Sequence, residues 1–462
     1  MPSSFEWNNY LELRPDKAGP IKLVRFLWSG YIAEGLDDHD AMICCSKGEK
    51  ENLKRRGIIS LILLLQMILL WIAKPLRNFG LVFEWFLNLP SSNRTWLELS
   101  LDLLTGEVKK ERESASFISA VGHTDKRVKL DRSINREDVR YKRALSAMAA
   151  KIAYENRAFI KTTVTNHWKM KLILIDDFWN EFQEKHTTQA FMLHDHDDEL
   201  IVVAFRGTEL FNAEDWSTDL DISWYKYDRI GKVHGGFMKA LGLTRQGWPK
   251  ELEQDDPRKL LAYYTIRNKL RELVKDTNNT KFIVTGHSLG GALAILFAAI
   301  LALHEEDLLL ERLEGVYTFG QPRVGDKEFK GFMEEQMKTH SIKYQRIVYS
   351  NDLVPRIPFD SYTFLFKHFG TCLYYNSLYK EKILKEEPNK NYWDPMEAIS
   401  KRLVAVWELI RSFIIPHIEG WEYRENWLLK GVRVFGLIVP GAAAHNPHDY
   451  VNATRLAEST IK

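Results

Sequence analysis

The strongest hydrophobic signal in the chain is a run from Gly57 to Ala73, in which only two polar side chains interrupt the apolar ones. Basic residues 54–56 precede this run, and after Pro75 a second apolar stretch continues to Leu89. The first run is close to the lower limit of length for a membrane-spanning helix. Two apolar arms that meet at a proline predict either a helical hairpin that dips into lipid, or one oblique helix followed by an interfacial one. The alternative is a pair of buried core helices.

From Arg140 onward the pattern changes to alternating helices and strands, which predicts a mixed α/β domain. Short β-rich runs occur at residues 189–193 and 200–205. The segment between them, 194–199, is rich in His and Asp and so contains residue types that bind metals. Polar turns of this composition are the ordinary link between two strands, so we expect a hairpin turn there and no metal site.

These patterns predict four regions along the chain. Residues 1–56 form a polar N-terminal region and residues 57–90 a hydrophobic membrane or lipid-droplet anchor. Residues 91–139 are interpreted as a charged linker, and residues 140–462 as the catalytic domain. Within that domain, residues from about 361 to 440 are expected to form a cap-like insertion.

Composition narrows the classes of function. The 462 residues are 45% hydrophobic and 27% charged, which is typical of a globular protein. Because the formal net charge is only +2, no basic field of the kind that captures nucleic acid is present. Three cysteines, two of them adjacent, make a poor disulfide framework and favour a reducing compartment.

One segment has the form of a catalytic motif. Residues 281–285 form a short β-rich run, residues 292–303 form a long apolar helix, and Gly-His-Ser-Leu-Gly-Gly at 286–291 lies between them. A strand, a tight turn and a helix are the context that a nucleophile elbow needs. The alternative is a glycine-rich turn with an incidental serine, as in some nucleotide-binding folds.

The residue types in this turn suit nucleophilic catalysis. Ser288 would lie on a strained turn, and Gly286 and Gly290 on either side remove side chains that would collide. The amino end of the following helix would point at the serine, which favours a developing oxyanion, and would aim the Leu289 N–H at it. His287 completes the elbow.

A serine nucleophile also needs a base and an orienting acid, which follow it in the order Ser, Asp, His in this fold. Asp352 comes directly after the strand candidate 344–349, where the acid of such a triad belongs. Asp326 is a competitor that we expect to lie in a turn instead. The pattern alone does not choose the base among His368, His417, His445 and His448.

With these motifs in order, the chain resembles the class 3 lipases, the family of fungal triacylglycerol lipases, and most closely their plant oil-body branch. The resemblance spans residues from about 140 to the carboxyl end. It rests on five ordered motifs: Val203–Thr208, Val233–Phe237, Gly286–Gly291, Phe319–Gly325 and Asn351–Pro355.

The resemblance implies roles for further residues. The hydroxyl after Arg-Gly supplies a second oxyanion contact, which falls on Thr208, with Arg206 and His234 in supporting positions. Without the resemblance, Thr208 would be taken as a strand-end cap. The terminal His-x-Pro-x-Asp-Tyr segment of the oil-body branch matches His445 as the base. Fungal members have Asp-His before an aromatic residue instead, so His448 stays an alternative.

Two segments are candidates for covering the site. In fungal relatives a lid follows the oxyanion strand, which here points to residues 210–225 with Phe211, Trp216, Trp224 and Tyr225, aromatic residues that suit an interface. A helix is also expected within the insertion, either as a cap that meets lipid or as a helix packed on the core. Its apolar positions are Met396, Ile399, Leu403, Val406, Leu409, Ile410 and Phe413.

Together these features predict an α/β-hydrolase fold with a mostly parallel central sheet and a triacylglycerol lipase that acts on neutral lipid at a droplet surface. Ser288, His445 and Asp352 are its expected triad, and Thr208 and Leu289 its oxyanion hole. The chemistry requires no metal or organic cofactor. We expect the protein on oil bodies, associated with the membrane, with its catalytic domain facing the cytosol. The alternatives are a phospholipase A1 or galactolipase of the same family, and a catalytically silent droplet protein.

Overall fold

The structure is a computed structural model of the 462-residue chain. It describes residues 7, 9–30, 32–34, 40–46, 53–92, 96–243, 247–252, 258–275, 279–358, 365–390, 392 and 397–457.

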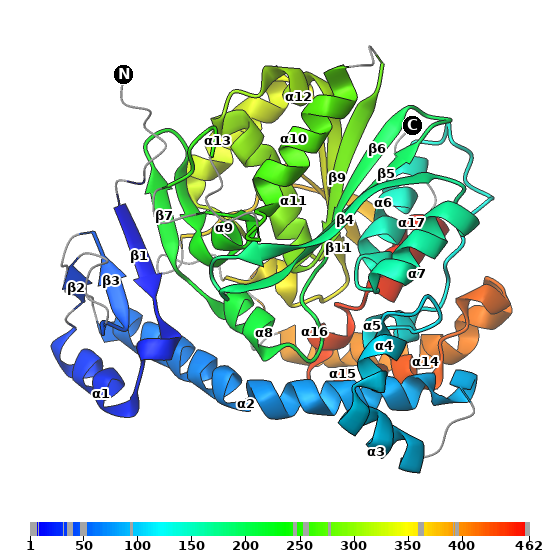
Figure 1. The fold of residues 1–462 in the computed structure, drawn as a ribbon, viewed down its shortest axis with the longest axis horizontal. Helices are drawn as coiled ribbons and strands as arrows, with labels where there is room; N and C mark the ends of the chain where they lie inside the picture. The colour runs from blue at the N-terminus through cyan, green and yellow to red at the C-terminus, as the bar shows by residue number, and fades with distance from the viewer. Residues whose placement is uncertain are drawn as a thin grey trace.

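An eight-stranded sheet runs through the centre of the catalytic domain, in the order β13-β12-β11-β10-β9-β6-β5-β4 (Figure 1). Strands β6, β9, β10, β11 and β12 run parallel to one another, and antiparallel pairings with β5 and β13 flank them. All six residues of β6 are buried, as expected for a parallel strand that is covered on both faces. The strands are β4 (Lys171–Asn180), β5 (Lys185–Asp195), β6 (Leu200–Phe205), β9 (Lys281–His287), β10 (Leu313–Phe319), β11 (Lys343–Tyr349), β12 (Thr371–Tyr375) and β13 (Glu381–Leu384).

Helices cover both faces of this sheet and form two hydrophobic cores. One core contains apolar side chains of α9, α10 and α11, and the other those of α6 and α17. This arrangement confirms the predicted α/β-hydrolase class with a mostly parallel sheet. The helices of the domain body are α6 (Tyr141–Ile152), α7 (Arg157–Thr162), α9 (Gly235–Leu241), α10 (Ala262–Lys275), α11 (Leu289–Leu303), α12 (Asp307–Arg312), α13 (Lys327–Thr339) and α17 (Pro447–Leu456).

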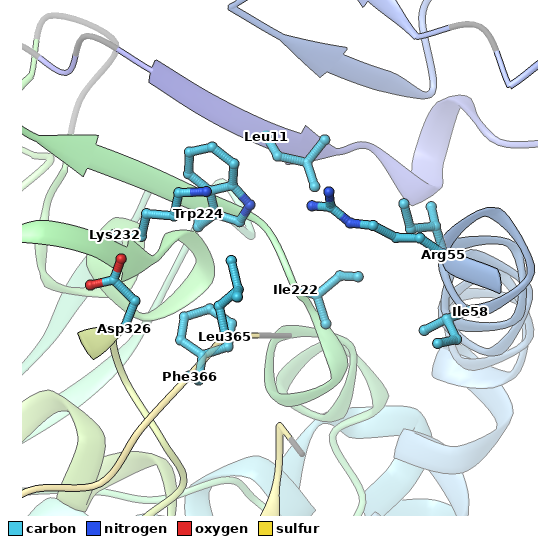
Figure 2. A pocket seen from close by; sticks show the side chains of 10 residues that line it. Leu11, Arg55, Ile58, Ile222, Trp224, Lys232, Asp326, Leu365 and Phe366 are labelled. Carbon is cyan, nitrogen blue, oxygen red and sulfur yellow. The ribbon is translucent and has the colours of Figure 1, made fainter. Parts of the chain in front are cut away.

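The N-terminal region is folded onto the catalytic domain. Strand β1 (Asn9–Leu13) pairs with β7 (Trp224–Tyr227) in a second sheet of order β2-β3-β1-β7-β8. The other members are β2 (Ala33–Glu34), β3 (Ile43–Cys45) and β8 (Gly231–His234), and α1 (Pro20–Ser29) lies beside them. Figure 2 shows a pocket where the N-terminal region meets the catalytic domain. The pocket lies between β1, the first turns of α2 (Leu53–Ser92) and the β7–β8 hairpin.

The hydrophobic run forms one continuous helix, α2 (Leu53–Ser92), which passes through Pro75 without a break. The hairpin alternative is therefore wrong. Leu53–Leu89 is long and apolar enough to cross a membrane, and its most apolar 18-residue stretch has a mean hydropathy of 2.2. One side of α2 is nevertheless packed on the protein, through buried residues such as Leu63, Gln66 and Trp85. In Figure 1, α2 lies along the base of the molecule.

Two predicted regions differ from what the structure shows. The stretch interpreted as a linker contains three helices: α3 (Trp96–Thr105), α4 (Glu107–Arg112) and α5 (Ala120–Thr124). The first part of the predicted cap instead extends the central sheet as β12 and β13. Its second part forms α14 (Ala398–Ile418), α15 (Trp427–Gly436) and α16 (Pro440–Ala443). Met396, assigned to the first of these helices, lies outside the described residues.

Candidate active site

Ser288 lies on a sharp turn between β9 and α11, with φ 58° and ψ −130°. A residue with a side chain is strained in this conformation, and such strain is typical of functional turns. A Cβ on Gly286 would come within 2.1 Å of the carbonyl carbon of Gly290, and a Cβ on Gly290 within 2.3 Å of the Phe205 carbonyl oxygen. The positions two residues before and two residues after Ser288 must therefore be glycine, as the motif predicts.

The turn brings Ser288 to a histidine and an aspartate from distant parts of the chain. His445, which precedes α17, places Nε2 2.8 Å from Ser288 Oγ. The same ring places Nδ1 2.8 Å from Asp352 Oδ2, at the end of β11. The Asp352 side chain is fully buried and that of His445 is mostly buried. This is the arrangement in which a histidine can take a serine proton while an acid holds its ring in place.

Asp352 itself is held by three groups. Tyr450 donates a hydrogen bond to Oδ2, and the backbone N–H of Val354 donates one to Oδ1 at 2.9 Å. The guanidinium of Arg356 donates to the backbone carbonyl of Asp352. Burial and the neighbouring carboxylate raise the pKa of Tyr450, so its hydroxyl keeps its proton and remains a donor. Tyr450 has no role predicted from the sequence, although it is part of the terminal motif that pointed to His445.

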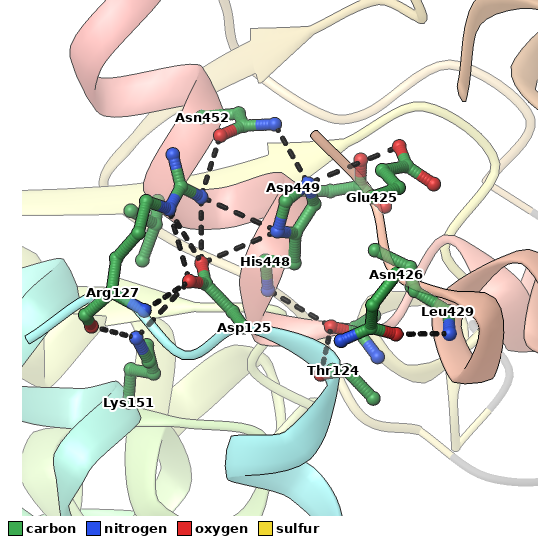
Figure 3. Close-up of polar contacts among 12 residues, drawn as sticks. Thr124, Asp125, Arg127, Lys151, Glu425, Asn426, Leu429, His448, Asp449 and Asn452 are labelled. Atoms are coloured by element: carbon green, nitrogen blue, oxygen red, sulfur yellow. Dashed lines mark hydrogen bonds and ion pairs between the residues drawn. The ribbon is translucent and has the colours of Figure 1, made fainter. Parts of the chain in front are cut away.

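The other candidates lie in different surroundings. His368 Nε2 lies 2.6 Å from the Pro355 carbonyl oxygen, and His417 lies on the exposed side of α14. His448 Nδ1 lies 3.3 Å from Asp125 Oδ2, and its Nε2 forms a hydrogen bond with the Asn452 side chain (Figure 3). Asp326 accepts a hydrogen bond from the Phe329 N–H and so caps the start of α13, instead of lying in the predicted turn.

The two predicted oxyanion donors come from neighbouring strands of the sheet. Leu289 is the first residue of α11, so its N–H has no acceptor within the helix. Thr208 follows β6, which pairs with β9, and its Oγ1 donates to Asp219 Oδ2 at 2.6 Å. Burial raises the pKa of Asp219 to about 7. Asp219 orients the Thr208 hydroxyl, and no sequence signal distinguishes it from other acids of that segment.

His287, beside the nucleophile, is kept neutral. Burial lowers its pKa far below the usual value, and the nearby His445 lowers it further. Tyr154 Oη lies 2.7 Å from His287 Nδ1, and burial raises the pKa of Tyr154, so the phenol acts as the donor. The centres of the His287 and His445 rings are 4.6 Å apart. A neutral His287 therefore adds no repulsion when His445 becomes charged.

Arg206 fixes the loop that carries Thr208, and His234 fixes the residue that follows α8 (Ala213–Leu220). Arg206 donates to the Gln189 side chain at 2.9 Å and to the Thr187 carbonyl at 2.7 Å. His234 Nδ1 accepts from a backbone N–H at the start of α9, so its Nε2 carries the proton and donates to the Asp221 carbonyl at 2.6 Å. Burial lowers the pKa of His234 to about 4, so it remains neutral at physiological pH.

The segment expected to be a lid contains a helix, α8 (Ala213–Leu220), and this helix packs against α2. Gln66 Nε2 donates to the Ser217 carbonyl at 2.9 Å. The Phe211 ring centre lies 5.6 Å from that of Phe79, and a Cβ on Gly80 would come within 2.6 Å of Phe211. The hydrophobic helix thus lies directly on the predicted lid.

The aromatic residues of that segment do not all face outward. Tyr225 lies in β7 and is buried, with its hydroxyl donating to Glu12 at 2.7 Å. Its predicted place at an interface is therefore wrong, because pairing of β7 with β1 covers it.

Comparison with known proteins identifies the family of the chain. A family model described as lipase (class 3) matches residues 202–362. A protein of Nicotiana tabacum named triacylglycerol lipase OBL1 is 40% identical over 87% of this chain and 84% of its own length. The chain belongs to the class 3 lipase family.

An Arabidopsis thaliana protein with the same name is 38% identical to this class 3 lipase over 97% of the chain and 95% of its own length. A solved structure of the Rhizomucor miehei lipase propeptide complex is 25% identical, with a TM-score of 0.40, and covers 56% of this chain and 74% of that one. The family match includes Thr208, Ser288 and Asp352, whereas His445 lies beyond it.

Thr208→Val tests the oxyanion assignment, because valine keeps the shape of the side chain and removes its donor. We expect kcat for a short soluble ester to fall by about 10²–10³ with little change in KM. Thr208→Ser keeps the hydroxyl and should retain most of the activity. Unchanged kcat in the valine variant would rule out a role for the Thr208 hydroxyl in the reaction.

Proposed function

We propose that this class 3 lipase hydrolyses triacylglycerol by a Ser-His-Asp acyl-enzyme mechanism. The observation that carries the proposal is the single His445 ring, whose two nitrogens lie 2.8 Å from Ser288 Oγ and 2.8 Å from Asp352 Oδ2. Nucleophile, base and orienting acid are thereby joined in one chain of hydrogen bonds.

In the first half-reaction, Ser288 Oγ attacks the ester carbonyl carbon while His445 Nε2 takes the serine proton. The Leu289 N–H stabilises the oxyanion of the tetrahedral intermediate, and the Thr208 hydroxyl does so by turning its one proton from Asp219 to the oxyanion. His445 then gives the proton to the departing alcohol oxygen, which leaves as diacylglycerol. Water, deprotonated by His445, attacks the acyl-serine ester, and His445 returns the proton to Ser288 Oγ as the fatty acid departs. These side chains supply the base, the nucleophile and the oxyanion donors, so the mechanism uses no metal or organic cofactor.

The proposed substrate and location follow from the plant relatives and from α2. The two relatives are named triacylglycerol lipases and align over most of the chain. The exposed side of α2 is strongly apolar, with Trp71 83% exposed. We therefore place the enzyme on the surface of oil bodies, anchored through α2, with its catalytic domain on the cytosolic side.

Fatty-acid release by the full-length protein, measured on matched emulsions of triolein and of phosphatidylcholine, tests this function. We expect release from triolein to exceed release from phospholipid. Preferential phospholipid or galactolipid turnover would replace the proposal by a phospholipase A1 or galactolipase. If neither emulsion nor a soluble ester is hydrolysed, the chain is a silent droplet protein.

A further inference from the structure

Helix α14 has the opposite polarity to a surface helix in water. Its buried side carries Lys401, Glu408 and Arg411, whereas its exposed side is mostly apolar, with Ser400, Arg402 and His417 as the exceptions. A helix that covers a core in water buries its apolar side and exposes its charges. The exposed large apolar residues of α14 are Ile399, Leu403, Val406, Trp407, Ile410, Phe413, Ile414 and Ile418.

Helix α15 repeats this pattern. Arg433 is buried, and Trp427, Val434 and Phe435 are exposed. One arginine of each helix pairs with Asp449 of α17, which lies 2.7 Å from Arg433 and 3.0 Å from Arg411 (Figure 3 shows Asp449 and its surroundings). Because burying ions without partners is costly, this network holds the charges inward and leaves the apolar sides facing out.

The outward side of α15 continues into that of α2. Phe86, Leu87 and Leu89 of α2 line one apolar hollow together with Trp427 and Leu428 of α15. Two helices that are more than 330 residues apart in sequence thus form one apolar surface, which we call the apolar base. Contiguous exposed apolar surfaces of this kind mark sites of interaction.

The charges on α2 indicate what covers this base. Within Leu53–Leu89, the single acid, Glu84, is buried and paired with Arg112, and the exposed charged residues Lys54, Lys74 and Arg77 are all basic. Basic side chains beside apolar ones complement lipid phosphates and can extend to the headgroup region. Exposed tryptophans at the base, including Trp71 and Trp427, suit the boundary between hydrocarbon and water.

The contacts of α2 with the protein also set its orientation. The side-chain amide of Asn88 donates a hydrogen bond to the Ile118 carbonyl and accepts one from the Ile118 N–H. Gln66 donates to the Ser217 carbonyl of α8. A helix of 40 residues that is attached in this way lies along the domain over about 60 Å. To cross a bilayer through its most apolar part, residues 57–73, the helix would have to break the Gln66 contact and remove the buried Ile59 and Leu63 from the protein.

From these observations we propose that α2, α14 and α15 together form one docking face for the phospholipid monolayer of a lipid droplet, with α2 lying in the plane of that monolayer. The inference rests on the proposed function and extends it, because it assigns lipid contact to residues 398–436 as well as to α2. A monolayer has one polar side, so a protein that lies flat on it needs no crossing helix. Because α8 packs on α2, the predicted lid then lies next to the lipid.

An environment-sensitive dye on single cysteines tests this docking face in the full-length protein. The native residues Cys44, Cys45 and Cys372 are buried, so an introduced surface cysteine is labelled selectively. Ile410→Cys and Phe435→Cys report on α14 and α15, and Leu308→Cys, on α12 at the opposite end of Figure 1, is the control. With triolein droplets coated with phosphatidylcholine, we expect an emission shift to the blue at positions 410 and 435 and none at 308.

Trp71→Cys in α2 separates failure of this inference from failure of the proposed location. A blue shift at position 71 alone would overturn the docking face and leave the α2 anchor in place. No shift at any position would overturn both. Hydrolysis of a soluble ester, measured on the same samples, reports on the proposed reaction independently of docking.

A partition experiment gives the energetic test. Leu403→Glu with Phe435→Glu places two charges in the proposed face and should lower the droplet-bound to free ratio at least about tenfold. Val139→Glu with Leu308→Glu makes the same change at exposed apolar positions elsewhere and should leave the ratio unchanged. Equal ratios for the two double variants would overturn the proposal. A wild-type dimer that becomes monomeric only in the first variant, with unchanged partition, would show a contact between copies instead.

Discussion

Ser288→Ala should lower kcat for emulsified triolein by about 10⁴–10⁶, with the protein still folded and bound to droplets. The oxygen that attacks the ester is lost, whereas the oxyanion donors and the lipid-binding surfaces remain. His445→Ala should cause a comparable loss, and the double variant should be hardly worse than either single one, because the two residues act as a unit. Fatty-acid release by matched amounts of folded protein is the measurement.

His448→Gln is the matched control for the base. His448 is buried beside Asp125 and Asn452 and makes no hydrogen bond to Ser288. We expect this variant to be less stable but to keep kcat within a few-fold of the wild type once folded. If His448→Gln abolished turnover while His445→Ala retained it, the assignment of the base would be reversed.

Asp449→Ala should lower the free energy of unfolding by about 3–5 kcal/mol, because it leaves Arg411 and Arg433 buried without their shared carboxylate. Urea unfolding of the full-length protein is the measurement. Asp197→Ala, which removes a surface partner of Arg136, is the control and should change stability by less than about 1 kcal/mol. Equal effects of the two substitutions would mean that the buried network adds no stability.

The same carboxylate gives a pH dependence with a defined sign. Burial alone would raise the pKa of Asp449, but Arg433 and Arg411 outweigh it and hold the pKa at about 2, below the ordinary 3.8. The folded state therefore binds this proton less readily than the unfolded state does. The stability that Asp449 contributes is fully present above the ordinary pKa and is lost as the pH falls from 3.8 toward 2. The acid unfolding of Asp449→Ala should lack this component.

Local sequence was sufficient wherever neighbouring residues decide the structure. The β-rich run at 281–285, the two glycines and the apolar helix at 292–303 specify a strand, a turn and a helix without distant contacts. The structure has β9 and α11 in these places, with Ser288 strained between them. Asp352 was predicted in the same way, from its position at the end of a β-rich run.

The choice between His445 and His448 depended on a family motif, because both histidines lie in one short polar segment. Which of them faces Ser288 depends on where α17 packs, and that packing involves residues more than 300 positions away, such as Asn446 with Thr124. Asp219 was missed for a similar reason. Its link to Thr208 exists only because α8 folds back over the end of β6.

By itself, the sequence determined the α/β sheet, the strained serine turn and the apolar character of α2, since each follows from short-range pattern and steric constraint. Only the tertiary structure decided that α2 is unbroken and lies along the domain, that the N-terminal strands join β7, and that α14 faces outward with its apolar side. These features depend on contacts between distant segments and on buried ion pairs, whose partners a linear pattern does not specify.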